Sequence, residues 1–479
     1  MHLPALPHLF LADLPPEAPV TPSLVRDACI SVKRNRTQWL LPRRTSDLVD
    51  LIAYNADRWL QPDYPLRRTA LQAGAAELGF SAPTMARGLD TFFRQLTHDH
   101  LMGWLTQDLG DPRRLDEFSA PTAELRHGRL ALARGPELLA QVAAGNLPVS
   151  TLSLMVAGLL LRSGQFIKCS QRSTILPRLF AHSLAELEPK LGACLELASW
   201  PGGHEALEGA MMGEADCLVV QSSDTVVEDL RRRMPPTCHC VPYGHRLSFG
   251  FVAGEVLGTF LARKVAERAA IDIASWNQMG CLSPHVLYVE DTGTLTPEGF
   301  AAALSEAMAR LEDTEPRGDL RPDEAAAIDQ RRSLHQLRAA HHRSLHRDAI
   351  TVPRGAFFEA PTAETQVWSS EGSTAWTVVY EADPTFRTSC LNRFIYVKPC
   401  RNLADALRRA EVVRGQVSTV GIATTEGRSQ ELALELARWG VSRICPLGRM
   451  QEPALAWRHD GRPSLAALVQ WTDWEQASS

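Results

Sequence analysis

The feature that most constrains this chain's fold is an alternation of short apolar segments with helical segments, which begins near residue 138. Strands joined by helices of this length are typical of a parallel sheet with helices on both faces. The sequence therefore predicts an α/β fold in this region. The candidate strands are Gln141–Gly145, Gln165–Lys168, Cys194–Ser199, Cys217–Gln221 and Cys238–Pro242, and the candidate helices are Val149–Leu161, Thr174–Leu187, His204–Gly213 and Thr225–Met234.

Flanking segments extend this pattern on both sides. Upstream, two stretches have the apolar spacing of amphipathic helices, and Ala123–Ala133 alternates polar and apolar residues around a possible hairpin turn at His127-Gly128. Downstream, helices and strands continue to alternate, and the charged helix Pro322–His346 is a candidate surface arm. The upstream helices are Thr45–Leu60 and Ser81–Leu105; the downstream elements are Gly254–Ala274, Val286–Glu290, Pro297–Arg310, Thr377–Tyr380, Phe394–Lys398, Ser418–Ala423, Gln430–Trp439 and Arg443–Pro446.

Length and composition limit the class of protein. A chain of 479 residues with 45% hydrophobic and 22% charged residues fits two or three packed domains of a globular enzyme. A net charge of −5 gives no sign of nucleic-acid binding. Met1–Val25 lacks the basic start of a secretory signal, and the longest apolar run, Val149–Leu161, is too short to span a membrane. Ten cysteines without paired spacing favour reduced thiols, so we expect a cytoplasmic enzyme without membrane insertion.

Four turns follow successive candidate strands and carry polar residues or glycines. They are Gly145-Asn146-Leu147-Pro148, Lys168-Cys169-Ser170, Trp200-Pro201-Gly202-Gly203 and Ser222-Ser223-Asp224-Thr225. Ligands of open α/β sheets bind at the carboxyl ends of strands, so these turns are expected to line one crevice. Neither the Gly-x-Gly-x-x-Gly fingerprint nor a P-loop is present, which argues against an ordinary Rossmann nucleotide site.

Cys281 is the candidate nucleophile. It lies in Asn277-Gln-Met-Gly-Cys-Leu-Ser-Pro284, between a long predicted helix and a predicted strand. Gly280 permits close approach of the backbone, and Pro284 prevents continuation of a helix. An exposed turn of this kind offers backbone N–H groups to a thiolate or an oxyanion. The alternative is a buried structural cysteine, which is the commoner fate of a free cysteine when no other signal is present.

Eight ordered segments make the resemblance to a known family specific. They resemble the fatty acyl-CoA reductases of bacterial bioluminescence (LuxC) and their relatives in natural-product pathways, a branch of the aldehyde dehydrogenase superfamily. The resemblance covers about residues 125–475. The segments are GNLP (145–148), FIKCS (166–170), WPGG (200–203), SSDTV (222–226), VPYGHRLSFG (241–250), NQMGCLSPH (277–285), LNRFIYVKP (391–399) and WRHDG (457–461).

The resemblance implies an architecture. It is an aldehyde-dehydrogenase-like fold with a Rossmann-type nucleotide-binding domain, an α/β catalytic domain and a small β oligomerisation element. We accordingly expect a helical region at 1–120 that packs on the cofactor domain, and a nucleotide-binding domain at 121–270 with a β-hairpin near 123–133. A catalytic domain with the nucleophilic cysteine is expected at 271–447, and a tail at 448–479 that returns to the cofactor domain or to a subunit interface.

The resemblance also implies residue roles. Cys281 is the nucleophile, and the Asn146 side-chain amide forms the oxyanion hole with the Cys281 N–H. Lys168 reaches the adenosine ribose, and Ser222 and Ser223 face the pyrophosphate. Ser170, Gln171, Arg172 and Gly202 complete the expected cofactor site. Where the family usually has a glycine, this chain has Ser222.

Two departures from ordinary aldehyde dehydrogenases bear on the reaction. Their water-activating Glu has no counterpart in Pro242–Arg246, so an acyl-cysteine would be protected from hydrolysis. NAD-specific members often have a Glu where this chain has Gln171, followed by Arg172, which favours the 2′-phosphate of NADPH. The superfamily's later Glu-x-Phe motif, which holds the nicotinamide ribose, is not visible near Cys390–Phe394.

Weaker signals leave alternatives open. His245 could donate a proton to the aldehyde oxygen, or could hold its loop through a backbone hydrogen bond. Cys238-His239-Cys240 and the histidines of the Pro322–His346 arm lack the spacing of a zinc site, so no metal is expected.

We therefore expect an NADPH-dependent acyl-CoA reductase that forms an aldehyde through an acyl-cysteine. Its acyl donor is expected to be acyl-CoA, an acyl carrier protein or an acyl-transferring partner enzyme, and the chain is expected to form a homo-oligomer without binding nucleic acid. Two other functions remain open. One is a dehydrogenase that oxidises an aldehyde to an acid or acyl-CoA, and the other is a non-catalytic scaffold or carrier-docking subunit.

Overall fold

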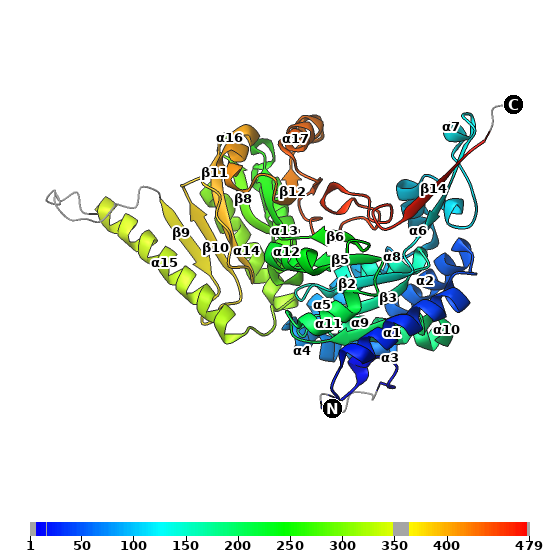
Figure 1. Cartoon of the computed structure of the whole chain (residues 1–479). Helices are drawn as coiled ribbons and strands as arrows, with labels where there is room; N and C mark the ends of the chain where they lie inside the picture. The colour runs from blue at the N-terminus through cyan, green and yellow to red at the C-terminus, as the bar shows by residue number, and fades with distance from the viewer. Residues whose placement is uncertain (1–5, 16, 348–363, 477–479) are drawn as a thin grey trace. The chain divides into compact units, whose positions relative to one another are not determined.

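The computed structural model describes residues 6–15, 17–347 and 364–476 (Figure 1). The chain forms two compact units. The first contains Met1–Leu78, Met85–His245 and Ala454–Ser479, and the second contains Gly79–Thr84 and Arg246–Pro453. The chain thus leaves the first unit after His245 and returns to it at Ala454.

A five-stranded parallel sheet forms the centre of the first unit. Its strand order is β4-β3-β2-β5-β6. Strands β3 and β4 are added on one side of β2, and β5 and β6 on the other side. The order therefore reverses between β2 and β5, which is the position where open α/β sheets bind ligands. The strands are β2 (Leu138–Val142), β3 (Gly164–Cys169), β4 (Leu195–Ser199), β5 (Cys217–Gln221) and β6 (His239–Tyr243).

Helices cover this sheet and include the N-terminal region. Helix α1 (Pro22–Asn35) contacts β3 and β4, and its Val25, Cys29 and Val32 belong to one core with residues of the sheet and of α11. Helix α2 (Thr45–Leu60) packs against α8 and α9. The other helices of the unit are α3 (Pro65–Thr69), α4 (Ala75–Leu78), α6 (His98–Leu109), α7 (Thr122–Leu125), α8 (Pro148–Leu160), α9 (Ile175–Leu187), α10 (Pro189–Gly192), α11 (Glu205–Met212) and α12 (Asp224–Arg233); α5 (Ala82–Phe93) begins in the short segment assigned to the second unit.

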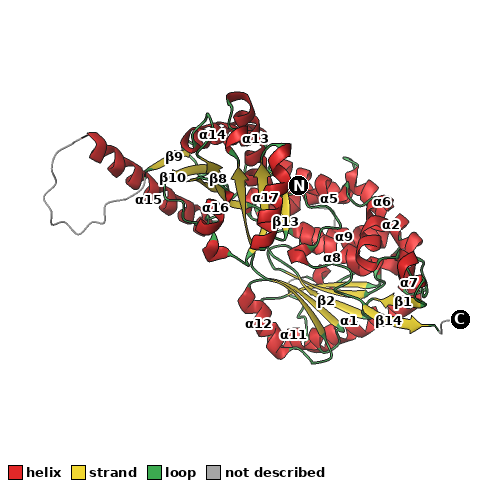
Figure 2. Cartoon of the chain, turned by 90° about the horizontal axis from the view of Figure 1, so that it is seen from above, coloured by secondary structure: helices red, strands yellow, loops and turns green. Residues whose placement is uncertain are grey.

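The hairpin predicted near 123–133 is wrong. The segment forms the short helix α7 and then β1 (Arg129–Arg134), which pairs antiparallel with β14 (Gln470–Glu475) near the C-terminus (Figure 2). The alternation of polar and apolar residues did indicate a strand, but its partner lies far along the chain. The single helix predicted at Ser81–Leu105 is also wrong, because the structure has two helices there, α5 and α6. Thr97 starts α6 by accepting a hydrogen bond from the His100 N–H.

A seven-stranded sheet forms the centre of the second unit. Its order is β13-β12-β7-β8-β11-β10-β9, and all neighbours are parallel except β9 and β10. The strands are β7 (Leu247–Val252), β8 (Pro284–Glu290), β9 (Thr365–Ser369), β10 (Thr377–Glu381), β11 (Phe394–Cys400), β12 (Val417–Ala423) and β13 (Arg443–Pro446).

Helices cover both faces of this second sheet. One core joins the strands to α13 (Thr259–Ala274) and α14 (Pro297–Thr314). Another core joins them to α16 (Leu403–Arg409) and α17 (Glu426–Trp439), and Ile328 of α15 (Pro322–Arg347) belongs to it. Figure 1 shows α15 alongside β9 and β10, so the predicted surface arm packs on the sheet over part of its length.

The boundary predicted at residue 270 differs from the structure. Strand β7 pairs with β8 and β12, and α13 packs on the same sheet, so residues 246–270 belong with the candidate nucleophile. Within the described ranges, none of the helices combines the length and apolar character needed to cross a membrane.

Candidate active site

Cys281 lies on a tight turn at the amino end of β8. A hydrogen bond from the Ser283 N–H to the Gly280 carbonyl closes a four-residue turn with Cys281 in its second position. The Ser248 hydroxyl, from β7, donates to the Cys281 carbonyl oxygen at 2.7 Å. The Cys281 side chain is half-buried. The location predicted from sequence, between a long helix and a strand, is confirmed.

Two left-handed backbone segments support this turn. Trp276, Asn277 and Gln278 have φ values of 52°, 50° and 63°, and Leu391, Asn392 and Arg393 have values of 65°, 55° and 64°. Such conformations are costly for residues other than glycine and persist only where their surroundings hold them.

The Gln278 side chain joins these two segments. It donates to the Pro284 and Phe394 carbonyls, at 2.8 and 2.9 Å, and accepts from the Phe394 N–H at 2.8 Å. Gln278 is fully buried. Its amide therefore fixes the start of β8 and the start of β11 to the residues just before Cys281.

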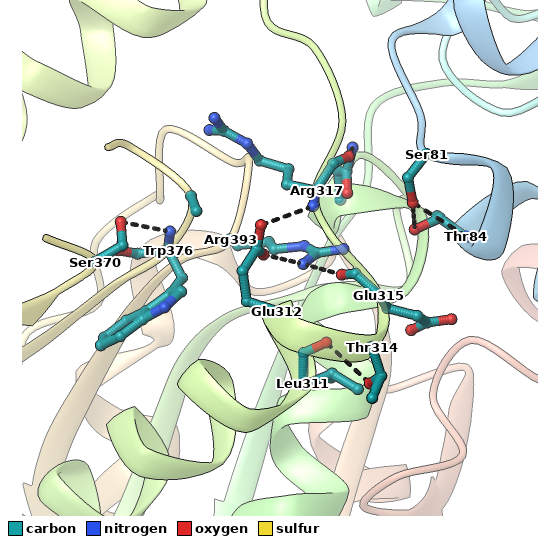
Figure 3. A network of polar contacts seen from close by, with 12 residues as sticks. Ser81, Thr84, Leu311, Glu312, Thr314, Glu315, Arg317, Ser370, Trp376 and Arg393 are labelled. Atoms are coloured by element: carbon teal, nitrogen blue, oxygen red, sulfur yellow. Dashed lines mark hydrogen bonds and ion pairs between the residues drawn. The ribbon is translucent and has the colours of Figure 1, made fainter. Parts of the chain in front are cut away.

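A second set of contacts completes a ring around the same segments, and Figure 3 shows the part of it formed by Glu312, Glu315, Arg317 and Arg393. The Asn277 side chain donates to the Arg317 carbonyl at 2.7 Å, and the Arg317 N–H donates to Glu312 at 3.1 Å. Arg393 forms an ion pair with Glu312 at 2.7 Å and donates to the Glu315 carbonyl at 2.8 Å. Burial lowers the pKa of Arg393 to about 10, and Glu312 opposes that shift. Because Arg393 precedes Phe394, the ring closes through Gln278.

The segment after β13 also attaches to the nucleophile turn; we call residues 447–452 the 447–452 loop. The Gln451 side chain donates to the Ser283 hydroxyl at 2.7 Å. Asp272, on α13, accepts from the N–H groups of Gly448 and Met450. Burial raises the pKa of Asp272 to about 7, and those two hydrogen bonds oppose the shift.

In the first unit, the predicted active-site and cofactor residues follow the carboxyl ends of β2, β3, β4 and β5. Gly145 follows β2, and a Cβ placed there would lie 2.5 Å from the Ser170 hydroxyl, so a larger residue would require Ser170 to move. Asn146 is exposed on the same turn, and Gln171 and Arg172 are exposed after β3.

Lys168 is the residue before the last one of β3 and is 7% exposed. Burial lowers its pKa, while the charge of Glu208 raises it. Glu208 also accepts from the Gly203 N–H at 3.0 Å and forms an ion pair with Arg233 at 2.6 Å. The carboxylate thus holds the turn that contains Gly202, next to the lysine. A Cβ atom placed at Gly202 would meet no atom within 4 Å, so there is open space beside that turn.

Ser222 and Ser223 lie between β5 and the N-terminus of α12, where Ser223 is the N-cap residue. The Ser222 N–H donates to the Tyr243 carbonyl at 3.2 Å, and Asp224 accepts from the His245 N–H at 3.0 Å. The backbone of His245 therefore fixes its loop, while its side chain is exposed. This hydrogen bond involves only the backbone of His245.

The C-terminal segment covers the end of β6 in this unit. The His459 ring stacks on Tyr243 with centroids 4.2 Å apart, Trp457 contacts His459, and Arg462 donates to the Pro242 carbonyl at 2.6 Å. The sequence motif WRHDG (457–461) had no predicted role, and in the structure it packs over the end of β6.

Sequence reasoning missed Ser248, Gln278 and the 447–452 loop. Ser248 and Gln278 lie inside recognised motifs, which was the available signal. Among the described residues, no group of three or more histidine, cysteine or acidic residues is arranged to hold a metal ion.

A family model described as acyl-CoA reductase (LuxC) matches residues 40–471. The chain belongs to the LuxC family. The resemblance inferred from sequence is therefore confirmed. Curated relatives of this LuxC-family chain include the long-chain acyl-protein thioester reductase of Photorhabdus laumondii, 22% identical over 91% of this chain and 83% of the relative. A protein of the same name from Vibrio harveyi is 20% identical over 90% and 83%.

Solved structures show that the fold is that of aldehyde dehydrogenases, as predicted. A lactaldehyde dehydrogenase has a TM-score of 0.66 at 14% identity, covering 96% of this chain and 92% of that one. An indole-3-acetaldehyde dehydrogenase from P. syringae, in complex with NAD+, has a TM-score of 0.67 at 13% identity, covering 95% and 89%. Bradyrhizobium japonicum proline utilization A has a TM-score of 0.67 at 16% identity over 95% of this chain, which spans only 45% of its length.

Proposed function

We propose that this LuxC-family chain reduces an acyl thioester to an aldehyde through an acyl-cysteine at Cys281, with NADPH as reductant. The observation that carries the proposal is the Cys281 turn itself, held by Ser248 and Gln278 in a member of an acyl-CoA reductase family. The names of the two curated relatives, both thioester reductases, support reduction of an acyl group.

The first half of the reaction is acyl transfer. The Cys281 thiolate attacks the thioester carbonyl carbon, a C–S bond forms, and the carbonyl oxygen becomes an oxyanion. The Asn146 amide and the Cys281 N–H are proposed to donate hydrogen bonds to that oxyanion. When the oxyanion collapses, the donor's C–S bond breaks and its thiol leaves, so that the acyl group remains on Cys281.

The residues at the carboxyl ends of the first sheet fit a nicotinamide dinucleotide. The strand order reverses between β2 and β5, and Lys168 lies near the carboxyl end of β3. The glycine turn at Gly202 has open space beside it, and the N-terminus of α12 follows Ser222 and Ser223. Lys168 is proposed to hold the adenosine ribose, the two serines the pyrophosphate, and Gln171 with Arg172 the 2′-phosphate. When bound, NADPH supplies a hydride to the acyl carbon.

In the second half, Cys281 releases the product. The thiohemiacetal on its sulfur loses its C–S bond, which restores the thiolate and frees the aldehyde. His245 is proposed to donate a proton to the forming alkoxide and to recover it on collapse. The stretch from Val241 to Gly250 contains no carboxylate, so it offers no carboxylate base for hydrolysis of the acyl group.

The experiment is intact-mass analysis after incubation with a panel of acyl-CoAs and without NADPH. One acyl group should add to the wild type and none to Cys281→Ala. Cys390→Ala and Cys240→Ala are matched controls, because both thiols are also half-buried, and both variants should acylate normally. Acylation of Cys281→Ala at another residue would overturn the assignment. Absence of acylation from every donor would favour a scaffold or docking subunit.

The acyl donor is the open part of this proposal. The family model names acyl-CoA, whereas the two curated relatives are named for acyl-protein thioesters. Acylation by acyl-CoA should therefore be compared with acylation by an acyl carrier protein bearing the same chain. Aldehyde oxidation with and without coenzyme A, assayed on the same protein, tests the alternative of an oxidising dehydrogenase.

A further inference from the structure

Arg443 is a charged residue that neither sequence motif nor proposed mechanism uses. It begins β13, and its register partner is Thr419 on β12. Thr419 is the partner of Ser248, and Ser248 is the partner of Pro284 at the start of β8. One row across the sheet therefore leads from Arg443 to Ser248, whose hydroxyl holds the Cys281 carbonyl.

The Arg443 guanidinium is oriented by the 447–452 loop. It donates to the Met450 carbonyl at 2.7 Å and to the Arg449 carbonyl at 2.8 Å. The same loop reaches the nucleophile turn through Gln451 and Ser283. The guanidinium and the Cys281 turn are thus attached to one short piece of chain.

We propose that Arg443 is a positioning residue that stabilises the Cys281 thiolate through its charge, while its hydrogen bonds hold the 447–452 loop against the nucleophile turn. The inference deepens the proposed function and rests on it for the role of Cys281 as nucleophile. A guanidinium keeps its proton throughout the working pH range, so this charge would be constant.

Charge interactions between the groups agree with this assignment. Burial lowers the pKa of Arg443, whereas negative charge on Cys445, Asp272 or Cys281 raises it and Arg449 lowers it. Coulomb attraction is mutual, so if a Cys281 thiolate favours the charged guanidinium, the guanidinium favours the thiolate to the same extent.

Other ionisable groups packed around the turn have weaker claims to this role. Burial raises the pKa of Cys445 to about 11 and that of Asp272 to about 7, and neither group carries positive charge in any protonation state. Arg449 pairs with Glu452 and is largely exposed. His285, on β8, accepts from the Ser389 N–H through Nδ1, in the direction of the 391–393 segment.

The test is the pH dependence of Cys281 alkylation by iodoacetamide, followed by peptide mass mapping in the full chain without acyl donor. Arg443→Gln keeps hydrogen-bond donors but removes the charge, and should raise the midpoint of the profile by about one pH unit. At a pH below both midpoints, about tenfold less Cys281 is then thiolate. Arg443→Lys keeps the charge and should retain the wild-type midpoint. Arg449→Gln removes a neighbouring exposed charge and should also leave it unchanged.

An unchanged midpoint in Arg443→Gln would overturn the proposal, as would an equal rise in Arg443→Lys and Arg443→Gln. If Arg443→Gln does not fold, judged by its melting temperature, Arg443→Met removes the charge in its place, and an unchanged midpoint in that variant would equally overturn the proposal. The readout requires no acyl donor or cofactor. A failure of acyl transfer to Cys281 would therefore count against the proposed function, and an unchanged alkylation profile against the role of Arg443.

Discussion

Ser248 and Gln278 fix the nucleophile turn from two directions. The Ser248 hydroxyl donates to the Cys281 carbonyl and accepts from the Thr419 N–H at 3.2 Å, while the Gln278 amide holds the residues on either side of the turn. A nucleophile gains most when its attack geometry is set before the substrate arrives. The polar groups that do this here come from β7, from β12 and from the left-handed segment just before the turn.

Asn146→Ala tests the proposed oxyanion hole. Loss of one donor should slow acylation of Cys281 by about 10²–10³-fold, since such donors stabilise charge that develops only in the transition state. The measurement is the rate of acyl addition by rapid quench and intact mass. NADPH affinity, measured by fluorescence titration, is the control and should change little. An unchanged acylation rate would make Asn146 a structural turn residue.

Cofactor preference tests Gln171 and Arg172. We expect a higher kcat/KM with NADPH than with NADH, because Arg172 is exposed after β3 and can approach a phosphate. Arg172→Gln should reduce that ratio about tenfold, as expected for one lost hydrogen bond to a charged group. Arg126→Gln, which removes another arginine of the first unit, should leave the ratio unchanged. Equal or reversed kcat/KM values in the wild type would contradict the preference.

The amino-acid sequence identifies residues whose role follows from a local motif. It does not identify residues whose role depends on how distant strands pair. Cys281, Asn146 and Lys168 stand at strand–turn junctions that the apolar pattern already locates. Ser248 and Arg443 acquire their positions from pairings between β7, β12 and β13, which lie far apart in the chain. No local pattern encodes those pairings.

At the scale of elements, the buried parallel strands were the easiest to predict. Cys217–Gln221 and Arg443–Pro446 were predicted with the bounds that β5 and β13 have, because each is a short apolar run between turns or helices. Strands β7, β9 and β14 were missed. Strand β14 is exposed along its whole length, so it carries no burial pattern, and it is ordered by pairing with β1.

Helix α14 offers a test of the ring around the two left-handed segments. Glu312→Gln should leave the Arg393 guanidinium, 1% exposed, without its anionic partner and destabilise the protein by about 3 kcal/mol. Acylation of Cys281 should slow about tenfold as the turn loosens. The control is Glu306→Gln on the same helix, whose exposed pair with Arg310 contributes little. Melting temperatures and acylation rates that match between the two variants would show that the ring does not support the turn.

His335, on helix α15, should make the free energy of unfolding depend on pH. Burial lowers the pKa of His335 to about 4, assisted by Arg338, Arg387 and Arg331 and opposed by Glu381. An unfolded histidine gains its proton near pH 6.5, so this contribution to stability is present above that pH and is lost as pH falls toward 4. The loss at pH 5 should be about 2 kcal/mol.

His335→Gln should therefore show a smaller fall in melting temperature between pH 7 and pH 5 than the wild type. The exposed His98, which pairs with Asp50, supplies the control variant His98→Gln, with a wild-type pH slope. If His335→Gln and the wild type lose stability in parallel, the buried imidazole is not the source of the acid sensitivity.

At the scale of the whole molecule, the proposed reaction separates into an acyl-transfer half and a reductive half. Without NADPH the acyl-enzyme should accumulate and decay slowly, because no carboxylate between Val241 and Gly250 can activate water. His245→Glu places a carboxylate on the exposed side chain of that loop and should speed release of free acid. His245→Gln is the neutral control and should not. Tyr243 is unsuitable for this substitution, since it is buried beneath His459.

The decay is followed by intact mass over time, with free acid and aldehyde quantified in the same samples. Rapid loss of the acyl group from the wild type, with free acid and no aldehyde, would favour a hydrolase or an oxidising dehydrogenase.

The route of the chain has a consequence for its synthesis. A ribosome makes β1 and Tyr243 early, but their partners β14 and His459 emerge only after every residue of the second unit. The nascent first unit must therefore wait with an unpaired strand edge and an uncovered aromatic ring while the nucleophile's sheet is being made. Contacts of such long sequence separation form slowly, and exposed edges invite aggregation. The segment that closes the first unit is thus made only after the second unit.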